Sequence, residues 1–72
     1  MEDFKISIAA ARVNAKKKQE EVAKALHVSK QTVGSWENGK TSPTIEKAME
    51  LCRFFNIPYD RVSFLRESNA IK

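Results

Sequence analysis

The segment QEEVAKALHVSKQTVGSWEN, residues 19–38, decides the fold of this chain. Its fourth, eighth, tenth, fifteenth and eighteenth positions are apolar, namely Val22, Leu26, Val28, Val33 and Trp36. This spacing gives each of two short helices one apolar face, and a turn of about three residues joins the helices. The small fifth residue, Ala23, allows the two helices to approach closely. We therefore predict a helix-turn-helix unit, with helices over residues 19–26 and 30–38.

The residues around the predicted turn have the properties that it needs. His27 interrupts the apolar pattern, and histidine is among the residues that tolerate a positive φ. Ser29 is placed to cap the second helix by accepting a hydrogen bond from the amide of Gln31 or Thr32. Gly39 follows the second helix, where a left-handed residue is favoured.

The chain before this unit predicts another helix. Phe4, Ile8, Ala11 and Ala15 recur at helical spacing, so we expect a helix over residues 3–15. The run Lys16–Lys18 follows as a basic connector. The helix after this connector begins without a good N-cap side chain.

Two further helices are expected beyond the unit. Pro43 suits the first turn of a helix over residues 44–55. Its inward face is predicted to carry Ile45, Ala48, Met49, Cys52 and Phe55, with Leu51 and Phe54 outside that stripe. A last short helix is expected from about Pro58 to Leu65. The chain is thus predicted to be all-α, with one domain over residues 1–66 and a flexible tail over residues 67–72.

The composition restricts the possible functions. Seventy-two residues form one domain at most, and such a domain has little interior for a catalytic cavity. One cysteine, Cys52, and one histidine, His27, are too few for a structural zinc site. No apolar run approaches the roughly 20 residues of a membrane-spanning helix, so we interpret the chain as cytoplasmic. We expect no enzyme activity, no metal and no cofactor.

The positive charge is concentrated in the first half of the chain. The net charge is +4, and residues 5–40 carry eight basic side chains against three acidic ones. A basic half favours a polyanionic partner, although a solvated lysine-rich surface would give the same count.

The sequence resembles the Cro/CI-type helix-turn-helix regulators, which have a lambda-repressor-like fold of five helices. The resemblance covers roughly residues 6–62 and rests on Arg12, QEEVAKAL (19–26), VSKQTVGSWENGKTSP (28–43) and NIPYDRV (56–62). The short chain is similar to the single-domain Cro-like and antirepressor proteins of temperate phages. It departs from the family at His27, where glycine is usual, and at Lys16–Lys18, where a glycine, an apolar residue and a capping residue are usual.

This resemblance implies a sequence-specific, DNA-binding transcriptional regulator of phage or prophage type. Its third helix would read the major groove through Lys30, Gln31, Thr32, Gly34 and Ser35. Two explanations are open for a glycine at position 34 inside this helix: close approach of the backbone to the groove, or close packing on a neighbouring protein helix. The alternative function is that of an antirepressor, which binds a partner helix-turn-helix repressor and masks its DNA-binding surface.

Other residues would position the protein without reading sequence. The expected phosphate contacts are Lys16, Lys17, Lys18, Gln19, Ser29, Asn38, Lys40, Thr41 and Ser42. Arg12 and Glu37 match a structural ion pair of the family, and Lys17 is expected to lay its aliphatic stem over the core. The expected partner is an operator in double-stranded DNA; a partner repressor and a second copy of the chain are the further candidates. Phe54, Phe64 and Leu65 either form that protein contact or close the core.

Overall fold

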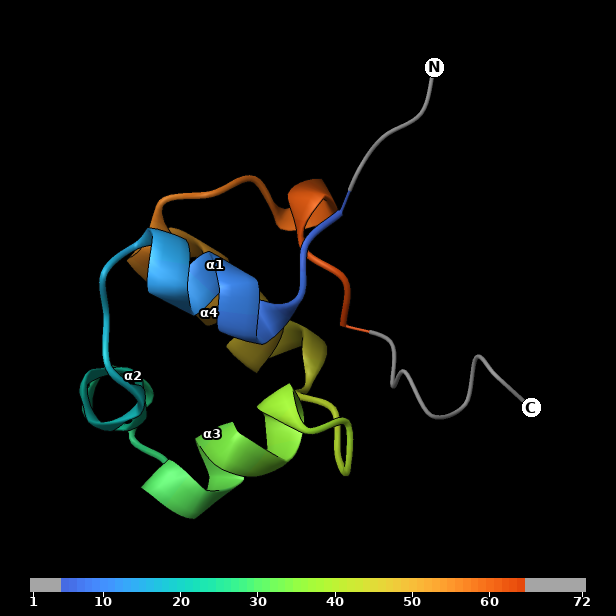
Figure 1. The fold of residues 1–72 in the computed structure, drawn as a ribbon. Helices are drawn as coiled ribbons and strands as arrows, with labels where there is room; N and C mark the ends of the chain where they lie inside the picture. Colours follow the sequence, from blue (N-terminus) through green and yellow to red (C-terminus); the bar gives the residue numbers. More distant parts are fainter. Residues whose placement is uncertain (1–4, 65–72) are drawn as a thin grey trace.

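The computed structural model describes residues 5–64 and is all-helical, as predicted (Figure 1). It contains α1 (Ile8–Asn14), α2 (Gln19–Leu26), α3 (Lys30–Glu37), α4 (Ile45–Phe55) and the 3-10 helix η1 (Tyr59–Arg61). Figure 1 shows α2 and α3 as neighbours joined by a short turn, with α1 and α4 above them. Within residues 5–64, no helix is long and apolar enough to span a bilayer.

The core confirms the apolar pattern of residues 19–38. Val22, Leu26 and Val33 are almost completely buried, and Trp36 is buried beside them. Ala23 is buried, so its small side chain lies between elements, and Val28 is half-buried against the same cluster. Buried residues of α1, α4 and Val62 complete this single cluster. The helix-turn-helix unit therefore contributes several of the most buried residues of the core.

The first helix begins later than the sequence pattern predicts. Helix α1 starts at Ile8, and the Ser7 hydroxyl caps it by accepting from the amide of Ala10 at 3.0 Å. The prediction of helix at Lys5 and Ile6 is wrong, because Ile6 forms a parallel bridge with Val62. The first residues of the predicted helix, 3 and 4, lie outside the described part of the chain.

The predicted helix from Pro58 to Leu65 is also wrong where the structure describes it. Only one 3-10 turn forms, Tyr59–Arg61. The carbonyl of Arg61 accepts from the Ile6 amide, and the Ser63 amide donates to the Ile6 carbonyl, both at 2.9 Å. These backbone groups are therefore unavailable for a longer helix. Residues 5–64 contain four α-helices, so the predicted count of five is not confirmed; Leu65 lies outside the described residues.

The inward face of α4 is rotated relative to the prediction. Its buried residues are Ala48, Leu51, Cys52 and Phe55, whereas Ile45 and Met49 are 71% and 46% exposed. The stripe at i, i+3, i+4 and i+7 that starts at Ala48 packs against the core, so the stripe that starts at Ile45 points outward. Pro43 also lies outside the first turn of α4.

The N-cap of α4 is Thr44. Its hydroxyl accepts from the Lys47 amide at 3.1 Å, so the helix starts two residues after Pro43.

Candidate nucleic-acid interface

The turn before α3 is held by backbone geometry and three hydrogen bonds. His27 has φ 60°, the left-handed conformation expected of it. The Ser29 hydroxyl accepts from the Thr32 amide at 3.0 Å, which confirms the predicted N-cap, and the two hydroxyls lie 2.8 Å apart. The Lys47 ammonium donates to the carbonyl of Leu26 at 2.8 Å, at the end of α2. The end of α2 and the start of α3 are therefore fixed relative to α4.

A half-buried network holds the other end of α3. Arg12 Nε donates to Glu37 Oε2 at 2.7 Å, and Arg12 Nη1 donates to the carbonyl of Lys17 at 2.9 Å. Gln19 Nε2 donates to Glu37 Oε1 at 2.9 Å. Only 7% of the Glu37 side chain is exposed, against 18% for Arg12. This network joins α1, the basic connector and α2 to the last residue of α3.

Seven of the sequence-predicted DNA contacts lie together. They line one shallow hollow of about 390 Å³ and are Gln19, Lys30, Gln31, Gly34, Ser35, Asn38 and Lys40. The hollow thus collects two ammonium groups, three side-chain amides and a hydroxyl, a set of groups able to bond base edges and phosphates.

The remaining predicted contacts do not line this hollow. Ser29 and Thr32 bond each other at the start of α3, and Thr41 lines a separate hollow beside α1. The Ser42 hydroxyl donates to the carbonyl of Phe64 at 3.3 Å. The Lys17 ammonium lies 4.9 Å from the centre of the Phe54 ring, so a cation–π contact accompanies the predicted burial of its stem.

The basic connector contains one residue in the left-handed conformation. Lys16 has φ 60°, at the position where the family usually has glycine. The Lys16 and Lys18 side chains are exposed. The Lys18 side chain does not cap α2, which agrees with the expectation that this helix begins without a good N-cap side chain. The carboxylate of Glu21 instead accepts from the Lys18 amide at 2.7 Å. One exposed amide at the start of α2 is therefore satisfied by a residue that the sequence analysis did not single out.

An acidic side chain faces the first residue of α3. Lys30 Nζ lies 3.7 Å from Glu20 Oε2, and these side chains are 58% and 68% exposed. Sequence reasoning missed this pair, because it joins two helices and depends on their crossing. Glu20 competes with any other acceptor for Lys30.

The apolar residues considered for a protein contact are partly used inside the chain. Phe54 and Phe64 are half-buried and pack against the core, and Phe64 also stacks on Tyr59 with ring centres 5.4 Å apart. Leu65 lies outside the described residues. Within residues 5–64, the large apolar side chains that are exposed are Val13, Ile45, Met49 and Tyr59. A homodimer stays a prediction.

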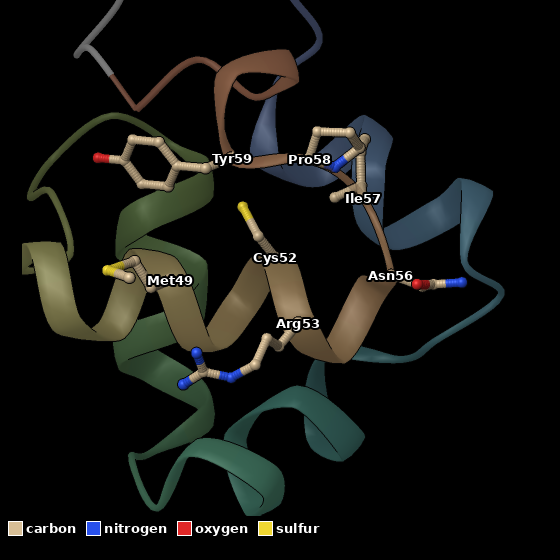
Figure 2. Close-up of a pocket in the computed structure, with 7 residues that line it drawn as sticks. All are labelled: Met49, Cys52, Arg53, Asn56, Ile57, Pro58 and Tyr59. Carbon is tan, nitrogen blue, oxygen red and sulfur yellow. The ribbon is translucent and has the colours of Figure 1, made fainter.

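A third hollow lies away from α3, along α4 and η1 (Figure 2). Its volume is about 470 Å³, and it is lined by Met49, Cys52, Arg53, Asn56, Ile57, Pro58 and Tyr59. Burial raises the pKa of the Cys52 thiol above its ordinary value, which keeps it protonated and weakly nucleophilic at neutral pH. Among residues 5–64, no three His, Cys, Asp or Glu side chains gather closely enough to hold a metal ion.

Comparison with known families decides the class of protein. A helix-turn-helix family model matches residues 8–62, which include all four α-helices. The chain belongs to the Cro/CI-type helix-turn-helix family. Members of this family are transcriptional regulators, so the helix-turn-helix unit is the part of the molecule from which function should be argued.

Two curated relatives carry related names. The chain is 33% identical over 66 residues to the cryptic phage CTXphi transcriptional repressor RstR of Vibrio cholerae, covering 92% of this chain and 60% of that repressor. It is 36% identical over 44 residues to an uncharacterised HTH-type transcriptional regulator of Methanocaldococcus jannaschii, covering 61% of this chain and 67% of the relative. The chain therefore spans less than two thirds of the length of RstR.

Proposed function

We propose that this protein is a sequence-specific DNA-binding transcriptional regulator of phage or prophage type, which reads the major groove with α3. The observation that carries the proposal is the hollow on α3, where Lys30, Gln31, Ser35, Asn38 and Lys40 gather on a helix-turn-helix scaffold. The similarity to a phage repressor supports the phage assignment.

Base reading would come from the first turns of α3. Gln31 is exposed and can bond adenine N6 and N7 with both atoms of its amide. Lys30 can donate to guanine O6 and N7 once it leaves Glu20. Ser35 lines the same hollow and can bond a base or a phosphate. A good bidentate contact discriminates by about 1–3 kcal/mol against the wrong base.

Phosphate contacts would flank the reading helix. Lys40 and Asn38 are exposed just beyond α3, and Lys16 and Lys18 are exposed before α2. Gln19 still has a second side-chain N–H to offer, because only one is needed for its bond to Glu37. These contacts carry no sequence information, but they make binding fall steeply with salt.

Reading by one helix covers few base pairs, so we propose that two copies bind one site. The half-sites would lie about 34–36 Å apart, one helical turn of DNA. The stoichiometry of the complex on a selected duplex, measured by analytical ultracentrifugation, tests this part. One chain per duplex at saturation would contradict it.

The first experiment is selection of binding sites from pooled random duplexes at several salt concentrations. We expect enrichment of a palindromic site by the wild type and its loss in Lys30→Ala/Gln31→Ala. Arg53→Ala is the matched control, because it removes one exposed positive charge from α4, away from the α3 hollow. No enrichment at about 50 mM salt, where phosphate contacts are strong, would contradict DNA binding.

The runner-up function is that of an antirepressor, and one contact favours it. Glu20 lies beside Lys30, so a carboxylate stands next to the proposed phosphate and base contacts. If selection fails, the same surface should be tested for binding to a helix-turn-helix repressor. Binding that displaces the repressor from its DNA would support masking.

A further inference from the structure

Gly34 occupies the middle of α3 without any requirement from the fold. Glycine in a helix interior destabilises the helix relative to alanine. Its φ is not positive, unlike that of Gly39, so the backbone does not require it. A Cβ built at Gly34 would meet no heavy atom within 4 Å beyond its own helix backbone and chain neighbours, so packing does not require it either. Neither the backbone conformation nor the packing of the described residues therefore accounts for this glycine.

Gly34 is one of the residues that line the hollow on α3. Lys30 and Gln31 precede it by four and three residues, and Asn38 follows it by four, so all share its helix face. A side chain at this position would stand between theirs and hold α3 away from an approaching surface. Without one, the backbone can come closer by the length of a carbon–carbon bond.

Gly34 also presents few hydrogen-bonding groups to an approaching ligand. Its carbonyl accepts from the Asn38 amide at 2.9 Å, and it has no polar side chain. At Gly34 the hollow therefore offers space without a polar side chain, although the other residues that line it are polar or charged. In the major groove, the group that needs space and no hydrogen-bond partner is the C5-methyl of thymine.

Resting on the proposed DNA-binding function, we propose that Gly34 determines specificity by receiving a thymine methyl in the major groove, beside the adenine that Gln31 reads. The glycine provides space for the methyl, while the surrounding Lys30, Gln31 and Asn38 bond the polar groups of neighbouring bases and phosphates. A protein helix packed on Gly34 is the competing explanation.

The test uses Gly34→Ala and the duplex selected by the wild type. The variant should be more stable, with Tm raised by about 4–8 °C, because alanine favours the helix and meets no clash. Its affinity for the selected duplex should fall about tenfold or more, because the alanine methyl would occupy the space proposed for the thymine methyl. Opposite signs for stability and affinity distinguish a contact residue from a structural one.

Deoxyuridine, which lacks the thymine methyl, identifies the base. Each thymine of the selected duplex is replaced in turn, and binding is measured by fluorescence anisotropy. The wild type should lose about fourfold at one position, the value for burying one methyl-sized group. At that position Gly34→Ala should instead bind deoxyuridine better than thymine.

Ala25→Gly provides the matched control. Ala25 is exposed on α2 and does not line the hollow, so this change should lower Tm without altering thymine preference. The double variant Gly34→Ala/Ala25→Gly should return close to the wild-type Tm and keep the altered preference.

Two outcomes would overturn the proposal. Unchanged DNA affinity in Gly34→Ala would do so, and would direct attention to a protein partner at α3. Weakened affinity with no position at which deoxyuridine reverses the loss would also do so. If the wild type itself selects no site, the proposed function fails first, and this is visible without any Gly34 variant.

Discussion

The helix-turn-helix unit and the segment after α4 are built by different means. In the unit, the turn and both helix starts are held by nearby groups, such as the Ser29 hydroxyl on the Thr32 amide. After α4, the only regular local structure in residues 56–64 is one 3-10 turn. The conformation of the residues that follow this turn depends on pairing with Ile6, which is far away in the sequence. Local interactions start the reading helix, and distant contacts such as Arg12–Glu37 then hold its far end. The carboxyl-terminal segment depends on tertiary pairing for its conformation from the outset.

The largest expected effect is that of truncating a core residue of the helix-turn-helix unit, compared with truncating an exposed residue of α4. Leu26→Ala at the end of α2 should lower the free energy of unfolding by about 2–5 kcal/mol, because Leu26 is completely buried. Met49→Ala on the exposed face of α4 should change it by about 0.5 kcal/mol or less. Urea unfolding followed by circular dichroism measures both. Similar losses would show that Met49 is buried in solution, as in an oligomer.

The same division explains which parts the sequence predicts. The apolar spacing of Val22, Leu26, Val33 and Trp36, with the Ser29 cap and the left-handed His27, specifies the unit within twenty residues. The α3 hollow follows from these elements, because helix geometry alone brings Lys30, Gln31 and Gly34 to one face.

The errors lie where distant residues compete with local preference. The bonds of Ile6 to Arg61 and Ser63 cannot be read from spacing, and they replace helix at both ends. The rotation of α4 depends on which of two apolar stripes meets the core. The pairing of Glu20 with Lys30 likewise requires the crossing of α2 and α3.

A second comparison sets the network of the unit against a surface pair of α4. Glu37→Gln should cost about 2–3 kcal/mol, because it leaves the half-buried Arg12 without its counter-charge. Glu50→Gln should cost about 0.5 kcal/mol or less, since the Lys47–Glu50 pair is about one-third exposed and separated by 3.7 Å. Thermal unfolding measures both variants. Equal losses would mean that the Arg12 network contributes no more than a surface pair.

Replacing residues of positive φ by glycine should stabilise the fold, and the gain should differ between the two regions. Lys16→Gly should raise the free energy of unfolding by about 1 kcal/mol, because lysine is strained at its φ of 60°. His27→Gly should gain less, because histidine tolerates a positive φ better than lysine does. Asn56→Gly, after α4, should gain only a few tenths of a kcal/mol, since asparagine tolerates its φ of 58°. Chemical unfolding of the three variants measures these gains. A loss at Lys16 would indicate that its side chain stabilises the connector by more than the strain costs.

The smallest expected effect concerns the pair that restrains Lys30. Glu20→Gln should change stability by about 0.5 kcal/mol or less, because the pair is exposed and long. It should nevertheless raise affinity for the selected duplex several-fold at low salt, since it frees Lys30 and removes a negative charge beside the hollow. Screening should bring the two proteins together as salt rises.

Glu46→Gln is the matched control for this last effect, because Glu46 is also exposed in the first turn of its helix, α4. Both variants lose the same charge and the same favourable interaction with a helix N-terminus. If both raise DNA affinity equally, only net charge matters, and the contact between Glu20 and Lys30 has no separate role. A larger gain for Glu20→Gln at low salt would identify Glu20 as a local restraint on the reading helix.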